Sequence, residues 1–124
     1  MFLTYQDAYY LHCVSIYKEL IHYNITAPLA ISATPTFYNP TIGTSVTLNC
    51  VVTSGTATSI TWLRNNVILN INANSRLTNG DVSTPSLSIN NVQQSDSGSY
   101  ACQAADATGT IVISNTISVT PQGM

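Results

Sequence analysis

Two cysteines and one tryptophan, each set in a run that alternates apolar with polar residues, constrain the fold of this 124-residue chain most. Cys50 closes the alternating run 46–50, Trp62 lies in the next such run, and Cys102 follows Tyr100 in a later one. Residues that alternate with period two point to opposite faces of a β-strand. We therefore expect Cys50, Trp62 and Cys102 on the inner sides of three strands that share one core.

The chain after residue 44 continues this pattern of short strands separated by turn residues. Val, Ile, Thr and Tyr, which favour strands, are abundant, and this composition argues against a disordered chain. The pattern is typical of an all-β antiparallel sandwich of about 100 residues, so the chain has room for one domain. We expect a further strand beginning at 76–77 and others at 86–89 and 110–119. Turns or loops are expected at 53–59, 79–81, 93–98 and 106–109. The segment 67–74 is either a short edge strand or an irregular connection.

Three prolines, Pro28, Pro35 and Pro40, lie before the first alternating run. Proline has no backbone N–H to donate to a β-ladder, so the residues around them are expected in edge strands with breaks. A first strand that passes from one sheet to the other would produce this arrangement.

The run Asp96-Ser97-Gly98-Ser99-Tyr100-Ala101-Cys102, preceded by Cys50 and Trp62, resembles the pattern that leads into the second bridge cysteine in the immunoglobulin superfamily. The resemblance covers residues 29–121 and implies an immunoglobulin-like two-sheet antiparallel β-sandwich with Greek-key connections and one intersheet disulfide. The interval between the cysteines is similar to that of I-set domains of adhesion and recognition proteins. The chain end lacks the glycine-rich joining segment of antigen-receptor variable domains.

The resemblance implies a disulfide between Cys50 and Cys102, with Trp62 packed against it. A bridge that closes about fifty residues would stabilise the fold by roughly 4 kcal/mol on a chain-entropy estimate. It also requires an oxidising compartment, which indicates an extracellular location, as a secreted protein or as the ectodomain of a membrane protein.

The resemblance further implies that Tyr100 turns its hydroxyl back to the backbone near Asp96 as a tyrosine corner. Arg76 lies where related domains carry an arginine that pairs with this aspartate, so we expect a salt bridge between Arg76 and Asp96. The alternative is that the two residues are unrelated surface charges.

Residues 1–28 form a leader before the expected domain at 29–121, and residues 122–124 form a tail. The leader is either a poorly ordered or weakly helical segment or the remnant of a preceding immunoglobulin domain, which would leave Cys13 without its partner. A cleavable signal peptide is not expected, because no basic residue precedes its uncharged stretch. Asn24 begins the only Asn-x-Ser/Thr pattern in which x is not proline, and it is a candidate glycosylation site.

The charge content excludes several functions. Three basic and five acidic residues give a net charge of -2, so no basic patch exists for nucleic acid or for a polybasic membrane contact. The sequence contains no run of 18 apolar residues that could span a membrane. We see no catalytic constellation, so no enzyme, cofactor or metal site is expected; His12, His22 and Cys13 in the leader fit no zinc pattern.

The function implied by the resemblance is an extracellular binding module for cell adhesion or for recognition of a protein or glycan, as part of a multidomain protein with neighbouring immunoglobulin-like domains. Partners would include a second copy, because a charge-poor sheet face could support self-association. Contacts are expected on edge strands and on loops 53–59 and 106–110. The alternatives are an immune-type or pattern-recognition receptor domain and a structural spacer in a matrix or elastic array.

Overall fold

The alternating runs form strands, and turn residues separate them. The computed structural model describes residues 27–123, which contain ten short strands and two single-turn 3₁₀ helices. The open segment at 67–74 becomes a two-residue strand followed by a 3₁₀ helix. The elements are β1 (Ala30–Thr34), β2 (Phe37–Tyr38), β3 (Val46–Ser54), β4 (Ser59–Arg64), β5 (Val67–Ile68), η1 (Ile71–Ala73), β6 (Leu77–Asn79), β7 (Leu87–Ile89), η2 (Gln94–Asp96), β8 (Gly98–Ala105), β9 (Ile111–Ile113) and β10 (Ile117–Val119).

One sheet has four strands in the order β1-β3-β7-β6, and each strand is antiparallel to its neighbours. Its longest strand, β3, follows the alternation of the sequence. Val46, Leu48 and Cys50 are buried, whereas Thr47 and Asn49 between them are exposed. One side of this sheet therefore faces the core and the other faces water.

The second sheet has the order β2-β10-β8-β4-β5, and β9 extends it by pairing with β8. The strand β2 runs parallel to β10, and the other pairs are antiparallel. The first strand changes sheets, as the prolines suggested: β1 pairs with β3, β2 pairs with β10, and the cis Thr34-Pro35 peptide lies between them.

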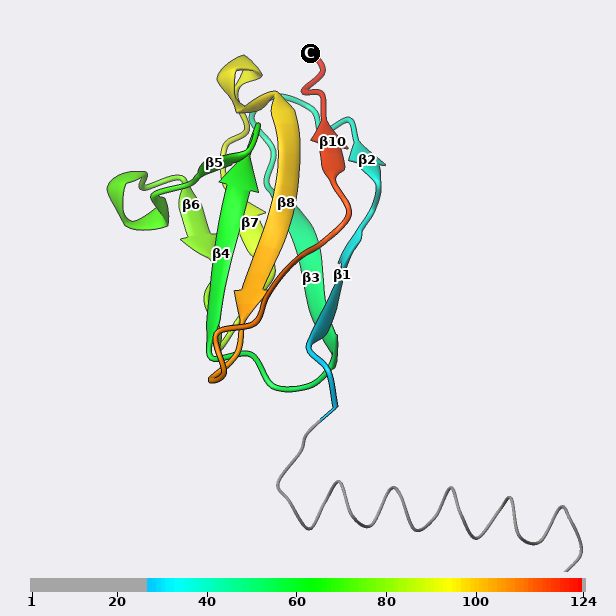
Figure 1. Cartoon of the computed structure of the whole chain (residues 1–124). Coiled ribbons are helices and arrows are strands. Elements are labelled where there is room, and N and C mark those ends of the chain that lie inside the picture. The colour runs from blue at the N-terminus through cyan, green and yellow to red at the C-terminus, as the bar shows by residue number, and fades with distance from the viewer. Residues whose placement is uncertain (1–26, 124) are drawn as a thin grey trace, which may run out of the picture.

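The two sheets form two layers around one core (Figure 1). The chain crosses between the sheets after β1, after β2, after β3, after β5 and after β7, and this connectivity has Greek-key character. The predicted immunoglobulin-like β-sandwich is confirmed. The largest fully buried side chains are those of Trp62, Tyr100, Leu48, Leu87, Ile89, Ile117, Val92, Val119 and Cys102.

Two boundaries differ from the sequence prediction. The single strand expected at 110–119 is wrong, because β9 and β10 are separate strands and the side chains of Ser114 and Asn115 bind distant backbone between them. The loop expected at 53–59 is shorter, because Ser54 still belongs to β3 and pairs with Ala30 of β1.

Candidate functional site

The disulfide joins the centres of the two sheets. Cys50 lies in β3 and Cys102 in β8, their Cα atoms are 6.3 Å apart, and both residues are buried. Trp62 is the cross-strand neighbour of Cys102 and is fully buried. Its indole Nε1 donates a hydrogen bond to the Pro85 carbonyl at 2.7 Å, which satisfies the one polar atom of the ring.

The hydroxyl of Tyr100 turns back along the chain. It donates a hydrogen bond to the Asp96 carbonyl at 2.7 Å, and only 1 % of the Tyr100 surface is exposed. Burial raises the pKa of Tyr100 to about 12, since ionisation would place a charge inside the core. This contact fixes the entry of the chain from η2 into β8.

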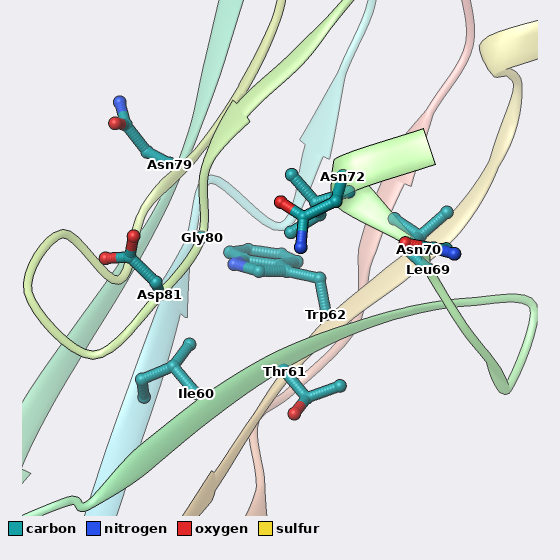
Figure 2. A pocket seen from close by; sticks show the side chains of 10 residues that line it. Ile60, Thr61, Trp62, Leu69, Asn70, Asn72, Asn79, Gly80 and Asp81 are labelled. Carbon is teal, nitrogen blue, oxygen red and sulfur yellow. The ribbon is translucent and has the colours of Figure 1, made fainter. Parts of the chain in front are cut away.

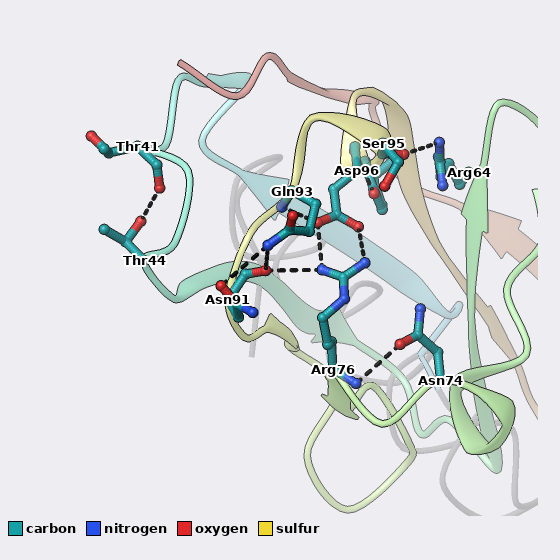
Figure 3. A network of polar contacts seen from close by, with 10 residues as sticks. Thr41, Thr44, Arg64, Asn74, Arg76, Asn91, Gln93, Ser95 and Asp96 are labelled. Carbon is teal, nitrogen blue, oxygen red and sulfur yellow. Dashed lines mark hydrogen bonds and ion pairs between the residues drawn. The ribbon is translucent and has the colours of Figure 1, made fainter. Parts of the chain in front are cut away.

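The structure places Arg76, just before β6, in contact with Asp96 in η2 (Figure 3). The guanidinium donates two hydrogen bonds to the carboxylate, at 2.6 Å and 3.0 Å, and a third to the Asn91 carbonyl at 3.1 Å. The Gln93 N–H also donates to this carboxylate, at 2.7 Å. Burial pushes the pKa of Asp96 upward, but these hydrogen bonds and the positive charge outweigh burial and lower it.

A further contact between the sheets escaped the sequence analysis. The side-chain amide of Asn115, between β9 and β10, accepts a hydrogen bond from the Ala33 N–H at 3.1 Å and donates one to the Ala33 carbonyl at 2.9 Å. Ala33 belongs to β1, the edge strand of the other sheet, and is 1 % exposed. The amide thus forms hydrogen bonds with the N–H and the carbonyl of Ala33, which at a sheet edge would otherwise be free to pair with another strand.

A hollow of about 270 Å³ lies beside Trp62 (Figure 2). Asn72 and Asp81 are among the polar side chains at its rim. The indole offers no exposed surface on which a ligand could stack, and Gly80 packs so closely that an added Cβ would lie 2.9 Å from the ring. The hollow is therefore a consequence of how the β6–β7 loop covers Trp62.

Within residues 27–123, no three His, Cys, Asp or Glu side chains gather closely enough to hold a metal ion. In the same part of the chain, no helix has the length and apolar character needed to cross a membrane. The candidate glycosylation site Asn24, and His12, His22 and Cys13 of the leader, lie outside the described residues.

The outer face of the six-stranded sheet is largely apolar over strands β9, β8, β4 and β5. Two rows of residues from neighbouring strands cross this face in register: Ile111 and Ala105 with Ser59, and Ile113 with Gln103 and Thr61. A third row consists of Ala101, Leu63 and Ile68. These rows, at the nine positions Ser59, Thr61, Leu63, Ile68, Ala101, Gln103, Ala105, Ile111 and Ile113, are here called the apolar face.

Exposure shows which side the apolar face occupies. Ile113 is 58 % exposed, whereas its strand neighbour Val112 packs against the core. Leu63 and Ala101 are 8 % and 6 % exposed, and neither belongs to the core between the sheets. The sequence held a signal for this surface: in Ile111-Val112-Ile113, consecutive apolar residues of a strand must point to both sides.

The apolar face carries no charged residue. The charged residues nearest to it in sequence are Arg64, at the end of β4, and Asp106, in the turn after β8. A guanidinium nitrogen of Arg64 donates to the Ser95 carbonyl, and Asp106 accepts hydrogen bonds from Thr108 and Thr110 within its own turn. Both charges are therefore engaged beyond the three rows.

The outer face of the four-stranded sheet is polar. Thr47, Ser88 and Thr78 lie opposite one another on three neighbouring strands, and the Thr47 and Ser88 hydroxyls are 3.3 Å apart. Asn49 and Val51 continue the outward side of β3, and Val51 is 55 % exposed. Hydroxyl and amide groups dominate this surface, so water can solvate most of it.

These features define a class: a two-sheet β-sandwich whose sheets are joined by a buried disulfide packed on a tryptophan. The protein-family model for the immunoglobulin domain matches residues 30–105 of this chain. The chain therefore belongs to the immunoglobulin family. The solved tandem Ig repeats of Dlar share the fold, with a TM-score of 0.67 and 23 % identity over 80 % of this chain and 48 % of that structure.

Two curated relatives are much longer proteins. Protein turtle homolog B of Mus musculus is 29 % identical over 93 residues, which are 74 % of this chain and 7 % of that protein. Cell adhesion molecule DSCAM of Homo sapiens is 31 % identical over 78 residues, which are 63 % of this chain and 4 % of DSCAM. The chain thus matches one small part of each relative, and it resembles immunoglobulin domains of adhesion-type proteins.

Proposed function

We propose that this chain is an extracellular recognition module for cell adhesion, which binds a protein partner and works as one domain of a longer protein. Its similarity to a cell adhesion molecule supports the adhesion role. The small share of each relative that the chain spans supports neighbouring domains. The disulfide supports the extracellular location, because such bonds persist in oxidising surroundings.

The observation that carries the proposal is the apolar face. Large exposed apolar side chains gathered on one surface without charge are uncommon on a protein that binds nothing, and they suit the desolvated centre of a protein interface. A glycan partner fits less well, because none of the nine positions of the apolar face carries an aromatic ring on which a sugar could stack. Of the surfaces that the sequence suggested, namely edge strands, the loops 53–59 and 106–110, and a charge-poor sheet face, this proposal selects the sheet face.

Cell attachment tests this function. Beads that carry the full chain are placed on cells from tissue that makes the protein, and the number of attached beads is counted. Ile113→Lys puts a charge on the apolar face and should reduce attachment at least tenfold. The matched control is Val51→Lys, because Val51 is exposed to a similar degree (55 % against 58 %) on the opposite face. Equal attachment by the native chain and by Ile113→Lys would refute the proposal.

A further inference from the structure

Another hollow, of about 270 Å³, lies where β4 turns into β5, and it is here called the Arg64 hollow. Arg64 and Asn65 line it together with three aliphatic residues, Val67, Ile68 and Leu69. Val67 and Ile68 are exposed, so this aliphatic wall is open to a partner. Pockets for small molecules commonly have volumes of roughly 300–1,000 Å³. The Arg64 hollow is smaller, and it fits one side chain of a protein partner better than a free small molecule.

The Arg64 hollow is continuous with the apolar face. Ile68 belongs to both, because it lines the hollow and pairs with Leu63 in the third row of the face. A protein seated on the apolar face therefore reaches the hollow along one surface. Protein interfaces commonly combine an apolar centre with a polar rim, and Arg64 lies where such a rim would be.

The positive charge of Arg64 has no carboxylate partner within residues 27–123. The ion pair in that part of the chain joins Arg76 to Asp96, and Arg76 already donates two hydrogen bonds to this carboxylate. Arg64 donates instead to the backbone carbonyl of Ser95, which is neutral (Figure 3). The charge beside the hollow therefore remains available to a partner.

Two other guanidinium nitrogens of Arg64 have no acceptor among the described residues. Nε is the one buried side-chain nitrogen or oxygen of residues 27–123 that lacks a hydrogen-bond partner. Nη1 makes no hydrogen bond either, and since it is not buried it is accessible to a partner. A carboxylate matches a guanidinium best, because it has the opposite charge and can accept two N–H groups at once.

We propose that the Arg64 hollow receives an acidic segment of the protein partner. One apolar side chain of the segment lies against Val67, Ile68 and Leu69, and the carboxylate of a neighbouring residue pairs with Arg64. This inference rests on the proposed function and specifies the chemistry of the partner, which would carry an acidic residue at the rim of an apolar surface. A basic segment would be repelled by the unpaired charge, so the pair would select among partners.

Two capped dipeptides test the Arg64 hollow: acetyl-Leu-Asp-amide and acetyl-Leu-Asn-amide, which differ in charge but hardly in shape. NMR titration of the full chain follows the methyl signals of Val67, Ile68 and Leu69. The acidic dipeptide should move these signals and bind at least threefold more tightly than the neutral one. Arg64→Gln should abolish this preference, whereas Arg64→Lys, which keeps the charge, should retain part of it. Asp81→Asn changes the net charge by the same amount in another loop and should leave the preference unchanged.

Three results would overturn the acidic segment: methyl signals that do not move at high millimolar dipeptide, equal binding of the two dipeptides, or a preference that survives in Arg64→Gln. Thermal melting of each variant shows whether it is folded.

The proposed function fails separately, in the bead assay. Equal attachment by the native chain and by Ile113→Lys refutes the function, whatever the dipeptides do. If Ile113→Lys abolishes attachment but Arg64→Gln attaches as the native chain does, the apolar face still binds a protein and only the acidic segment is excluded.

Discussion

The two sheets have similar inner faces and opposite outer faces. On the inside, both contribute tightly packed apolar residues to one core. On the outside, β3, β6 and β7 present hydroxyls such as those of Thr47, Ser88 and Thr78, whereas β9 and β5 present Ile111, Ile113 and Ile68. The core explains why the chain folds, and it does not explain why one outer face is apolar. That asymmetry is the feature that points to a partner.

The apolar face can present one fixed surface to a partner only if the two sheets are held together as one body. The contacts that join them include the disulfide at the centre, the Arg76–Asp96 pair at one end, and the Asn115–Ala33 contact along one edge. Removing each contact in turn measures how much it contributes to the free energy of unfolding of the sandwich that carries the apolar face.

The largest effect should follow loss of the disulfide. Cys50→Ala with Cys102→Ala removes a crosslink across 52 residues of sequence, which should lower the free energy of unfolding by about 4 kcal/mol on the chain-entropy estimate. Urea denaturation of the native and double-variant chains measures this loss.

A reductant provides the control for this experiment. It should shift the native transition toward that of the double variant and leave the double variant unchanged. A double variant as stable as the oxidised native chain would show that packing alone holds the sheets together.

Loss of Arg76 should have the next largest effect. Arg76→Ala leaves the carboxylate of Asp96, which is 6 % exposed, without its cation, and should cost about 3 kcal/mol of stability. Urea denaturation at pH 7 measures the cost. Asp81→Asn is the control, since Asp81 is an exposed aspartate whose hydrogen bonds stay within its own loop.

The same pair predicts how stability depends on pH. The pKa of Asp96 is lowered in the folded chain, so its contribution is complete above the ordinary aspartate pKa of 3.8 and is lost as pH falls through the lower folded value. Unfolding measured from pH 6 to pH 2 should show this loss in the native chain and less of it in Asp96→Asn. Identical pH profiles would contradict the assigned role of the carboxylate.

Sequence patterns predicted the parts of this molecule that repeat a local rule. Period-two alternation placed Cys50 and Trp62 on inner sides of strands, and the run into Cys102 resembled a known family. Neither kind of pattern reveals the role of Asn115, because its partner Ala33 is 82 residues away in the sequence. From the sequence alone, an asparagine that binds a distant strand cannot be distinguished from one in an ordinary loop. The same side-chain contacts divided the strand that was expected at 110–119.

The apolar face was only partly predictable. A charge-poor sheet face was expected, but which sheet would carry it depends on the pairing of strands. The registers Gln103 with Ile113 and Leu63 with Ile68 bring together residues from four strands, and no local run reveals that they are neighbours. The boundaries 29–121 and the role of residues 1–28 stay predictions.

Loss of the Asn115 amide should have a moderate effect. Asn115→Ala leaves the N–H and carbonyl of buried Ala33 without their partner, which should lower the free energy of unfolding by about 2 kcal/mol. Asn49→Ala, at an exposed position of β3, is the matched control and should change stability by less than about 0.5 kcal/mol. Equal losses in the two variants would show that the amide does not join β1 to the other sheet.

The smallest effect on stability should come from the apolar face itself, and this result would separate recognition from folding most clearly. Ile113→Thr and Val51→Thr replace similarly exposed residues by a strand-forming polar one, so each should change the free energy of unfolding by less than about 0.5 kcal/mol. Retention on a hydrophobic-interaction column should fall more for Ile113→Thr, because Ile113 adds to a continuous patch whereas Val51 stands among hydroxyl and amide groups. If Ile113→Thr instead destabilised the chain by several kcal/mol, the residue would serve the fold, and the contrast between the two outer faces would lose its functional meaning.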